Sequence, residues 1–192
     1  MVLDFFITAY EEMINSFIHN PLAQAIGCLA LILSLISFQM KTRSRILFFQ
    51  MLASLSCATS LIMLGGIAGG LLDVVAFSRT LIFSLGDKYA WARNKLWLPF
   101  YFVLIIAVGV ITWERGSIVT LFAILGTLLS TVALYMKREK HMRIISLFVG
   151  PCWIAYNLIY ASCFGILNEI IAMTSIAVAL WRMREKRISC GL

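Results

Sequence analysis

The chain has 192 residues, of which 61% are hydrophobic and 13% are charged, and its mean hydropathy is +0.94. Soluble domains carry about 25% charged residues, so this composition excludes an ordinary soluble domain and indicates an integral membrane protein. The net charge of +7 does not indicate nucleic-acid binding, because the basic residues stand at the ends of apolar runs. We therefore expect the lipid bilayer as a partner, and no nucleic acid.

Residues 1–20 predict an amphipathic helix that lies on a membrane surface. Polar residues recur at helical spacing, with apolar residues opposite them: Asp4, Thr8, Glu11, Glu12, Asn15 and His19. Asp4 interrupts the apolar start and no basic region precedes it, so the segment does not read as a signal peptide. Asn20-Pro21 is typical of a new helix start.

Seven apolar runs follow, most of them near the length that crosses the hydrocarbon core of a bilayer. Their approximate ranges are 22–40, 46–64, a third that ends at 85, 96–113, 117–136, 144–163 and 167–181. A glycine-rich stretch at 65–70 connects the second and third runs, and Gly165 separates the sixth from the seventh. The fold class is therefore an all-α integral membrane protein with seven transmembrane helices.

The first three runs resemble the last three. An offset of 95 relates Asp73 to Asn168 and Thr80 to Ser175, whereas an offset of 96 relates Ser34 to Ser130. Chance similarity between two apolar stretches is the alternative, but the matched polar positions argue against it. The repeat predicts two parallel three-helix units joined by a linker helix, a 3+1+3 arrangement. The expected parts are the helix 1–20, a first unit 21–87, the linker 88–116, a second unit 117–184 and a basic tail 185–192.

The basic residues predict the orientation. Fourteen of the 16 Lys and Arg residues fall on the side where the first run ends, whereas Arg115 falls on the other side and Arg79 within a run. Cytoplasmic loops carry the excess of Lys and Arg. We therefore expect a multi-pass protein of a bacterial inner membrane, with its amino terminus outside and its carboxyl terminus in the cytoplasm.

Polar residues inside the apolar runs are the candidate site. A charge at the bilayer centre costs about 2.5–3.5 kcal/mol on insertion scales, so such residues face the bundle interior or water. We expect a binding pocket for a small solute formed by Asp73, Trp153, Tyr156, Asn157 and Asn168. Residues expected to line or gate it are Gln39, Arg79, Thr80, Glu169 and Ser175. The alternative for any one of them is a structural hydrogen bond between helices.

The three intramembrane charges are not balanced. We expect Arg79 to pair with Asp73 or Glu169 across the bundle, or to extend towards the cytoplasm. A pair would leave one acid over, and our hypothesis is that this acid, Asp73 before Glu169, is protonated for part of a transport cycle.

Short motifs in a fixed order carry a resemblance to a known family. They are Ile26-Gly27, Ser37-Phe38-Gln39-Met40-Lys41, Leu64-Gly65 and Pro151-Cys152-Trp153-Ile154-Ala155-Tyr156-Asn157. From about Gln24 to Arg184 the chain resembles the bacterial inner-membrane YgjV family, within the SWEET, SemiSWEET and PQ-loop superfamily. The resemblance implies a transporter architecture in which Trp153, Tyr156 and Asn168 contact substrate. The first unit departs from it, with Ala58, Leu61 and Asp73 at the matching places, and Phe38 and Leu134 replace the motif prolines.

We therefore expect a small-solute transporter or facilitator that works by alternating access, with a small polar neutral or cationic solute favoured. The alternative is a non-transporting membrane sensor or assembly protein built on the same bundle. We expect no enzymatic activity, catalytic residue, cofactor or metal, because no nucleophile–base arrangement or metal-ligand spacing is present among the five cysteines and two histidines. The sequence leaves the substrate, the coupling ion and the oligomeric state open, a homo-oligomer included.

Overall fold

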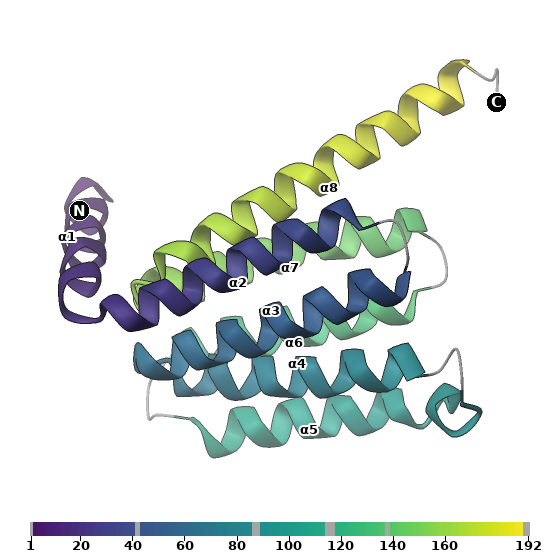
Figure 1. Ribbon diagram of the computed structural model, residues 1–192, viewed down its shortest axis with the longest axis horizontal. Coiled ribbons are helices and arrows are strands. Elements are labelled where there is room, and N and C mark those ends of the chain that lie inside the picture. The colour runs from purple at the N-terminus through teal and green to yellow at the C-terminus, as the bar shows by residue number, and fades with distance from the viewer. Residues whose placement is uncertain (1, 41–42, 86–88, 114–117, 137–138, 190–192) are drawn as a thin grey trace.

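The protein is all-helical, as predicted. The computed structural model describes residues 2–40, 43–85, 89–113, 118–136 and 139–189, and these ranges form eight α-helices and one short 3₁₀ helix (Figure 1). They are α1 Val2–His19, α2 Pro21–Gln39, α3 Arg43–Met63, α4 Ile67–Leu85, η1 Trp91–Arg93, α5 Trp97–Ile111, α6 Ile118–Tyr135, α7 Glu139–Ile159 and α8 Cys163–Ser189. The described residues contain no strand, which suits a chain whose backbone polar groups must be satisfied within each segment in lipid.

Five helices are long and apolar enough to cross a membrane: α3, α4, α6, α7 and α8. Segment Pro21–Ser37 of α2 meets the criterion only together with Glu11–His19 of α1, and the two are bent by 103°. Helix α5 is apolar but shorter, at 15 residues. The structure thus supports five or six spans by length and composition, and the 3+1+3 arrangement of seven spans remains an interpretation.

Six helices close into a ring. Their main contacts join α2 to α3, α3 to α4, α4 to α6, α6 to α7, α7 to α8, and α8 back to α2. Helices α6 and α7 lie behind α2, α3 and α4 in Figure 1, and α5 packs against α4 and α6 from outside the ring. The two three-helix groups are α2, α3 and α4, and α6, α7 and α8. When these groups are exchanged, the contact between α4 and α6 becomes the contact between α8 and α2. The order of neighbours in the ring is therefore the same when the two groups are exchanged, and α4 and α8 occupy opposite places in that order.

The bounds of the helices show that the two halves of the internal repeat are related by a uniform offset of 96 residues. Helices α3 and α7 begin at residues 43 and 139 and end at 63 and 159, and α4 and α8 begin at 67 and 163. The offset of 95 for the second half of each group is therefore wrong, because the turns between these helices have equal lengths. The counterpart of Asp73 is Glu169 rather than Asn168, and the counterpart of Arg79 is Ser175.

The turns that end α3 and α7 have the same hydrogen bonds. The amide of Gly66 donates to Leu61 O at 2.8 Å, and the amide of Ser162 donates to Asn157 O at 2.9 Å. In each turn the preceding residue also donates to a carbonyl three residues back and has positive φ, +87° for Gly65 and +49° for Ala161. These are Schellman motifs, which usually place glycine at this position. The α7–α8 turn thus lies at Ala161, and Gly165 is inside α8, not between the helices as expected.

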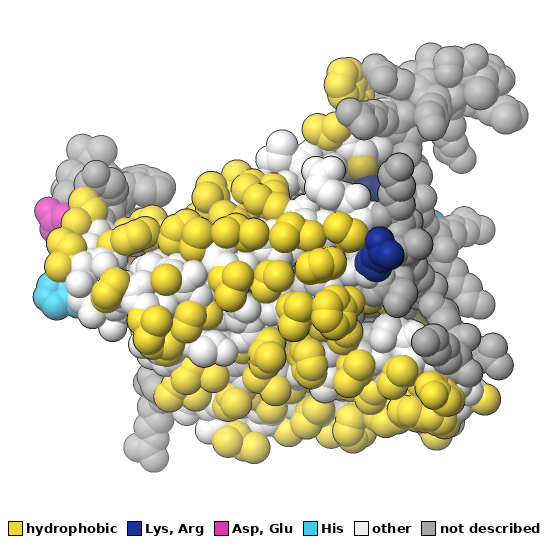
Figure 2. All heavy atoms as spheres, viewed as in Figure 1, with side chains coloured by type: hydrophobic (Ala, Val, Ile, Leu, Met, Phe, Trp, Pro, Cys, Tyr) yellow, Lys and Arg dark blue, Asp and Glu magenta, His cyan; other side chains and the backbone are white. Residues whose placement is uncertain are grey.

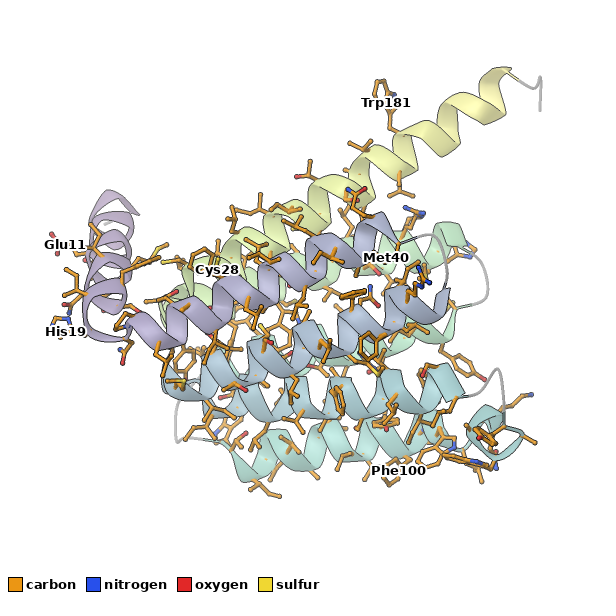
Figure 3. All side chains as sticks on the ribbon, in the orientation of Figure 1. Glu11, His19, Cys28, Met40, Phe100 and Trp181 are labelled. Carbon is orange, nitrogen blue, oxygen red and sulfur yellow. The ribbon has the colours of Figure 1, made fainter. Side chains whose placement is uncertain are left out.

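Helix α8 is longer than the predicted seventh run. It continues to Ser189, through most of the segment that was expected to be a tail, because Arg, Glu and Lys favour helix as strongly as most apolar residues. Its carboxyl-terminal half leaves the bundle, and Trp181 points away from the other helices (Figure 3). Only 6% of the α8 span is buried within the protein, against 39% of the α4 span.

The surface suits a lipid environment. Figure 2 shows hydrophobic side chains over the middle of one long face, with charged side chains towards the ends. Large apolar side chains from different helices are exposed, among them Leu29 at 49%, Phe48 at 53%, Val103 at 67% and Phe148 at 62%. The main buried cluster lies instead where α5 joins the ring, around Leu61, Leu72, Tyr101, Ile105, Trp153 and Tyr156.

Candidate functional site

A cavity of about 410 Å³ lies inside the ring. Its lining comes from α2, α3, α4, α6, α7 and α8, together with Ser162 in the turn between α7 and α8. Seven of the ten candidate residues border it: Asp73, Arg79, Thr80, Trp153, Asn157, Asn168 and Glu169. Asp73 lies on α4, and its counterpart Glu169 lies on α8. Each three-helix group therefore contributes one carboxyl group to the cavity.

The two acids have few partners. Asp73 borders the cavity together with Cys57, and its Oδ2 atom is buried and has no hydrogen-bond partner. The side chain of Glu169 accepts a long hydrogen bond of 3.5 Å from Asn168 Nδ2. Thr80 is not a partner of Asp73, because its hydroxyl group donates to Ala76 O in its own helix at 2.8 Å.

Arg79 is 4% exposed and reaches α6 rather than either acid. Its Nη1 donates to Ser130 Oγ at 3.1 Å, to Thr127 O at 3.3 Å and to Thr131 Oγ1. Its Nε has no partner. Neither expected arrangement is therefore present: among the described residues, the hydrogen bonds of Arg79 go to α6, and the group neither pairs with Asp73 or Glu169 nor extends to the surface.

Trp153 and Asn157 border the cavity from α7. Trp153 is 8% exposed and packs closely against Gly126 of α6. Asn157 is 2% exposed, lies against Gly165 of α8, and has an Oδ1 atom with no partner. Together with Asp73, these residues give the cavity one aromatic wall and several oxygen acceptors.

The unpartnered buried atoms concentrate in this cavity. Four buried side-chain nitrogen or oxygen atoms of the described residues have no hydrogen-bond partner, and three of them belong to cavity residues: Asp73 Oδ2, Arg79 Nε and Asn157 Oδ1. Buried polar atoms in proteins nearly always have a partner. A cluster of exceptions around one cavity points to a ligand or to water inside it.

Tyr156 does not line the cavity. It is fully buried, and its hydroxyl oxygen accepts a hydrogen bond of 2.7 Å from the backbone amide of Gly69. That amide lies in the first turn of α4, where helix amides lack partners within the helix. Gly69 has no Cβ, which would collide with the tyrosine ring. Tyr156 is thus placed to cap α4 and to hold α7 against it.

Two other candidates lie away from the cavity. Gln39 is the last residue of α2 and is exposed. Ser175 is exposed and borders an open groove on α8 with Thr174 and Val178. Gln39 lies outside the cavity because α2 ends there, whereas Ser175 faces away from the cavity although its neighbour Ile176 borders it.

Several polar residues of the cavity were not among the candidates. They include Ser34, Gln50, Ser54, Cys57, Ser60, Ser130 and Ser146. An offset of 96 pairs Ser34 with Ser130 and Gln50 with Ser146, so a strict repeat alignment could have found them. Within the described residues, no group of three or more His, Cys, Asp or Glu side chains could hold a metal ion.

Comparison with known proteins places the chain in a family. The family model Imp-YgjV, described as bacterial inner membrane protein, matches residues 21–187, from the first residue of α2 to within two residues of the end of α8. The chain belongs to the YgjV family of bacterial inner membrane proteins. It is 25% identical over 170 residues to inner membrane protein YgjV of Escherichia coli (strain K12), across 87% of this chain and 88% of that one. No solved structure matches it. This member of the YgjV family is therefore a multi-pass inner membrane protein.

Proposed function

We propose that this YgjV family member is a small-solute transporter or facilitator that works by alternating access. The observation that carries the proposal is the clustering of unpartnered buried atoms around a cavity inside a six-helix ring. Polar and charged groups at membrane depth are costly and mark pathways for ions or solutes. A structural bundle would be expected to pair these groups with one another.

The composition of the cavity supports a small polar neutral or cationic solute. Two carboxyl groups and three side-chain amides border it, with Trp153 as an aromatic wall. A simple anion would be repelled by the carboxylates of Asp73 and Glu169, so an anion is the least favoured class of solute. The hypothesis that Asp73 is protonated for part of a cycle stays a prediction.

Uptake into proteoliposomes tests the proposal. Purified protein is reconstituted, and a panel of small neutral, cationic and zwitterionic solutes is screened for protein-dependent uptake. Trp153→Ala and Asn168→Ala should abolish the uptake of any solute found, because both residues border the cavity. Phe148→Ala is the matched control, since Phe148 is 62% exposed on α7. Protein-dependent uptake that both cavity variants retain would contradict this site.

The alternative, a sensor or assembly protein on the same bundle, predicts a different result. Such a protein binds a solute without moving it, or binds none. Solute binding with no flux in the same vesicles would favour that alternative over a transporter.

A further inference from the structure

The charged groups of the cavity do not neutralise one another. Arg79 Nη1 is held by three oxygen atoms of α6, and its Nε is free. Asp73 keeps one buried oxygen without a partner, and Glu169 has only the long hydrogen bond from Asn168. A protein that needed these groups for stability alone would gain more by pairing them, because buried unpaired charges are unfavourable.

The two carboxyl groups and the guanidinium group of the cavity lie at different depths along the bundle. Asp73 and Glu169 each stand six residues after the first residue of their helices, Ile67 and Cys163, whereas Arg79 stands twelve residues after Ile67. With a rise of 1.5 Å per residue, the Cα of Arg79 lies about 9 Å further along the bundle than that of Asp73. Asn157, two residues before the end of α7, belongs to the acidic end.

We propose that the cavity binds a small zwitterion, with its ammonium group among Asp73, Asn157 and Glu169 and its carboxylate group at Arg79. An ammonium group donates three hydrogen bonds, and the acidic end offers oxygen atoms from three different helices. The guanidinium group of Arg79 suits a carboxylate, which forms charge-assisted hydrogen bonds with it.

Other charge classes leave part of the cavity unsatisfied. A simple cation balances the net charge of the two acids and Arg79, but it contacts only the acids and leaves Arg79 without an anion. A simple anion pairs with Arg79 and meets two carboxyl groups. A neutral polyol satisfies hydrogen bonds but neutralises no charge. The inference rests on the proposed function, because it names the solute class of the same cavity.

Four-carbon probes separate these classes at an equal number of carbon atoms. They are 4-aminobutyrate and 2-aminobutyrate as zwitterions, n-butylamine as cation, butyrate as anion and butyramide as neutral compound. Melting temperatures of the purified protein in detergent report binding, since a ligand that binds the folded state raises them. We expect a rise with at least one aminobutyrate, at concentrations where butyrate and butyramide have no effect and n-butylamine has less.

Variants then test each end. Arg79→Gln should reduce the response to the aminobutyrate to that of n-butylamine, a loss of affinity of about 10- to 100-fold for one charged hydrogen-bonding group. Asp73→Asn should weaken the binding of both amines. Arg45→Gln and Glu11→Gln are the controls, because both side chains are exposed outside the cavity. If Arg79→Gln fails to fold, the five probes on the unmodified protein still decide.

The outcomes separate this inference from the proposed function. Equal stabilisation by n-butylamine and the aminobutyrates, or stabilisation by butyramide, overturns the zwitterion and leaves transport of another solute class intact. Stabilisation by none of the five overturns it as well. Zwitterion binding to protein that gives no flux in proteoliposomes supports the inference and contradicts the proposed transport.

Discussion

At the scale of single residues, Tyr156 ties two helices together rather than facing a solute. Its hydroxyl oxygen is the acceptor for the Gly69 amide at the start of α4. Tyr156→Phe leaves that buried amide without a partner, which costs about 1–3 kcal/mol of stability. We expect a lower melting temperature in detergent, with ligand binding retained. Tyr89→Phe, at a position 52% exposed, is the control. Unchanged stability in Tyr156→Phe would show that the bond contributes nothing.

The placement of Tyr156 also shows how far helical spacing carries a site prediction. Trp153, Tyr156 and Asn157 share one stripe, and two of the three border the cavity. Residues three apart on a helix differ by about 60° in direction, which is enough to turn Tyr156 towards α4. Nothing in the local sequence shows which neighbouring helix provides a glycine at that point.

At the scale of elements, the two Schellman turns differ in one residue. Ala161 adopts a φ of +49° where the equivalent Gly65 has +87°. A left-handed conformation costs an ordinary residue about 1–2 kcal/mol, and glycine avoids this cost. Ala161→Gly should therefore stabilise the protein by about 1 kcal/mol, measured by thermal unfolding. Ala155→Gly, inside α7, should destabilise it by a similar amount. Destabilisation by both would contradict the strain at Ala161.

Apolar runs predicted the helices well because a run of about 20 apolar residues has few alternatives in lipid. The turn before α8 was misplaced because Ala161 is not a turn-forming residue and Gly165 is. The misplaced turn hid the uniform offset, so Asp73 was matched with Asn168 instead of Glu169. Ser175 was expected in the site because it lies seven residues after Asn168, but its side chain is exposed, and the neighbouring Ile176 borders the cavity instead.

At the scale of the whole molecule, orientation follows from charge. Met40 lies at one end of the bundle, and Glu11 and His19 lie at the other (Figure 3). The excess of Lys and Arg on the Met40 side predicts that this end is cytoplasmic. In a variant without other cysteines, Cys190, which lies outside the described residues, should resist an impermeant thiol reagent added to intact cells and react after permeabilisation. Ready labelling in intact cells would reverse the orientation.

The central claim is that the cavity opens to the two sides of the membrane in turn. Cys57 borders the cavity next to Asp73 and can report this directly. In a variant that keeps only Cys57, a small impermeant thiol reagent is applied to one side at a time, in intact cells and in inside-out vesicles. The account predicts labelling from both sides, slowed by a bound solute. Labelling from one side only, or from neither, would contradict it.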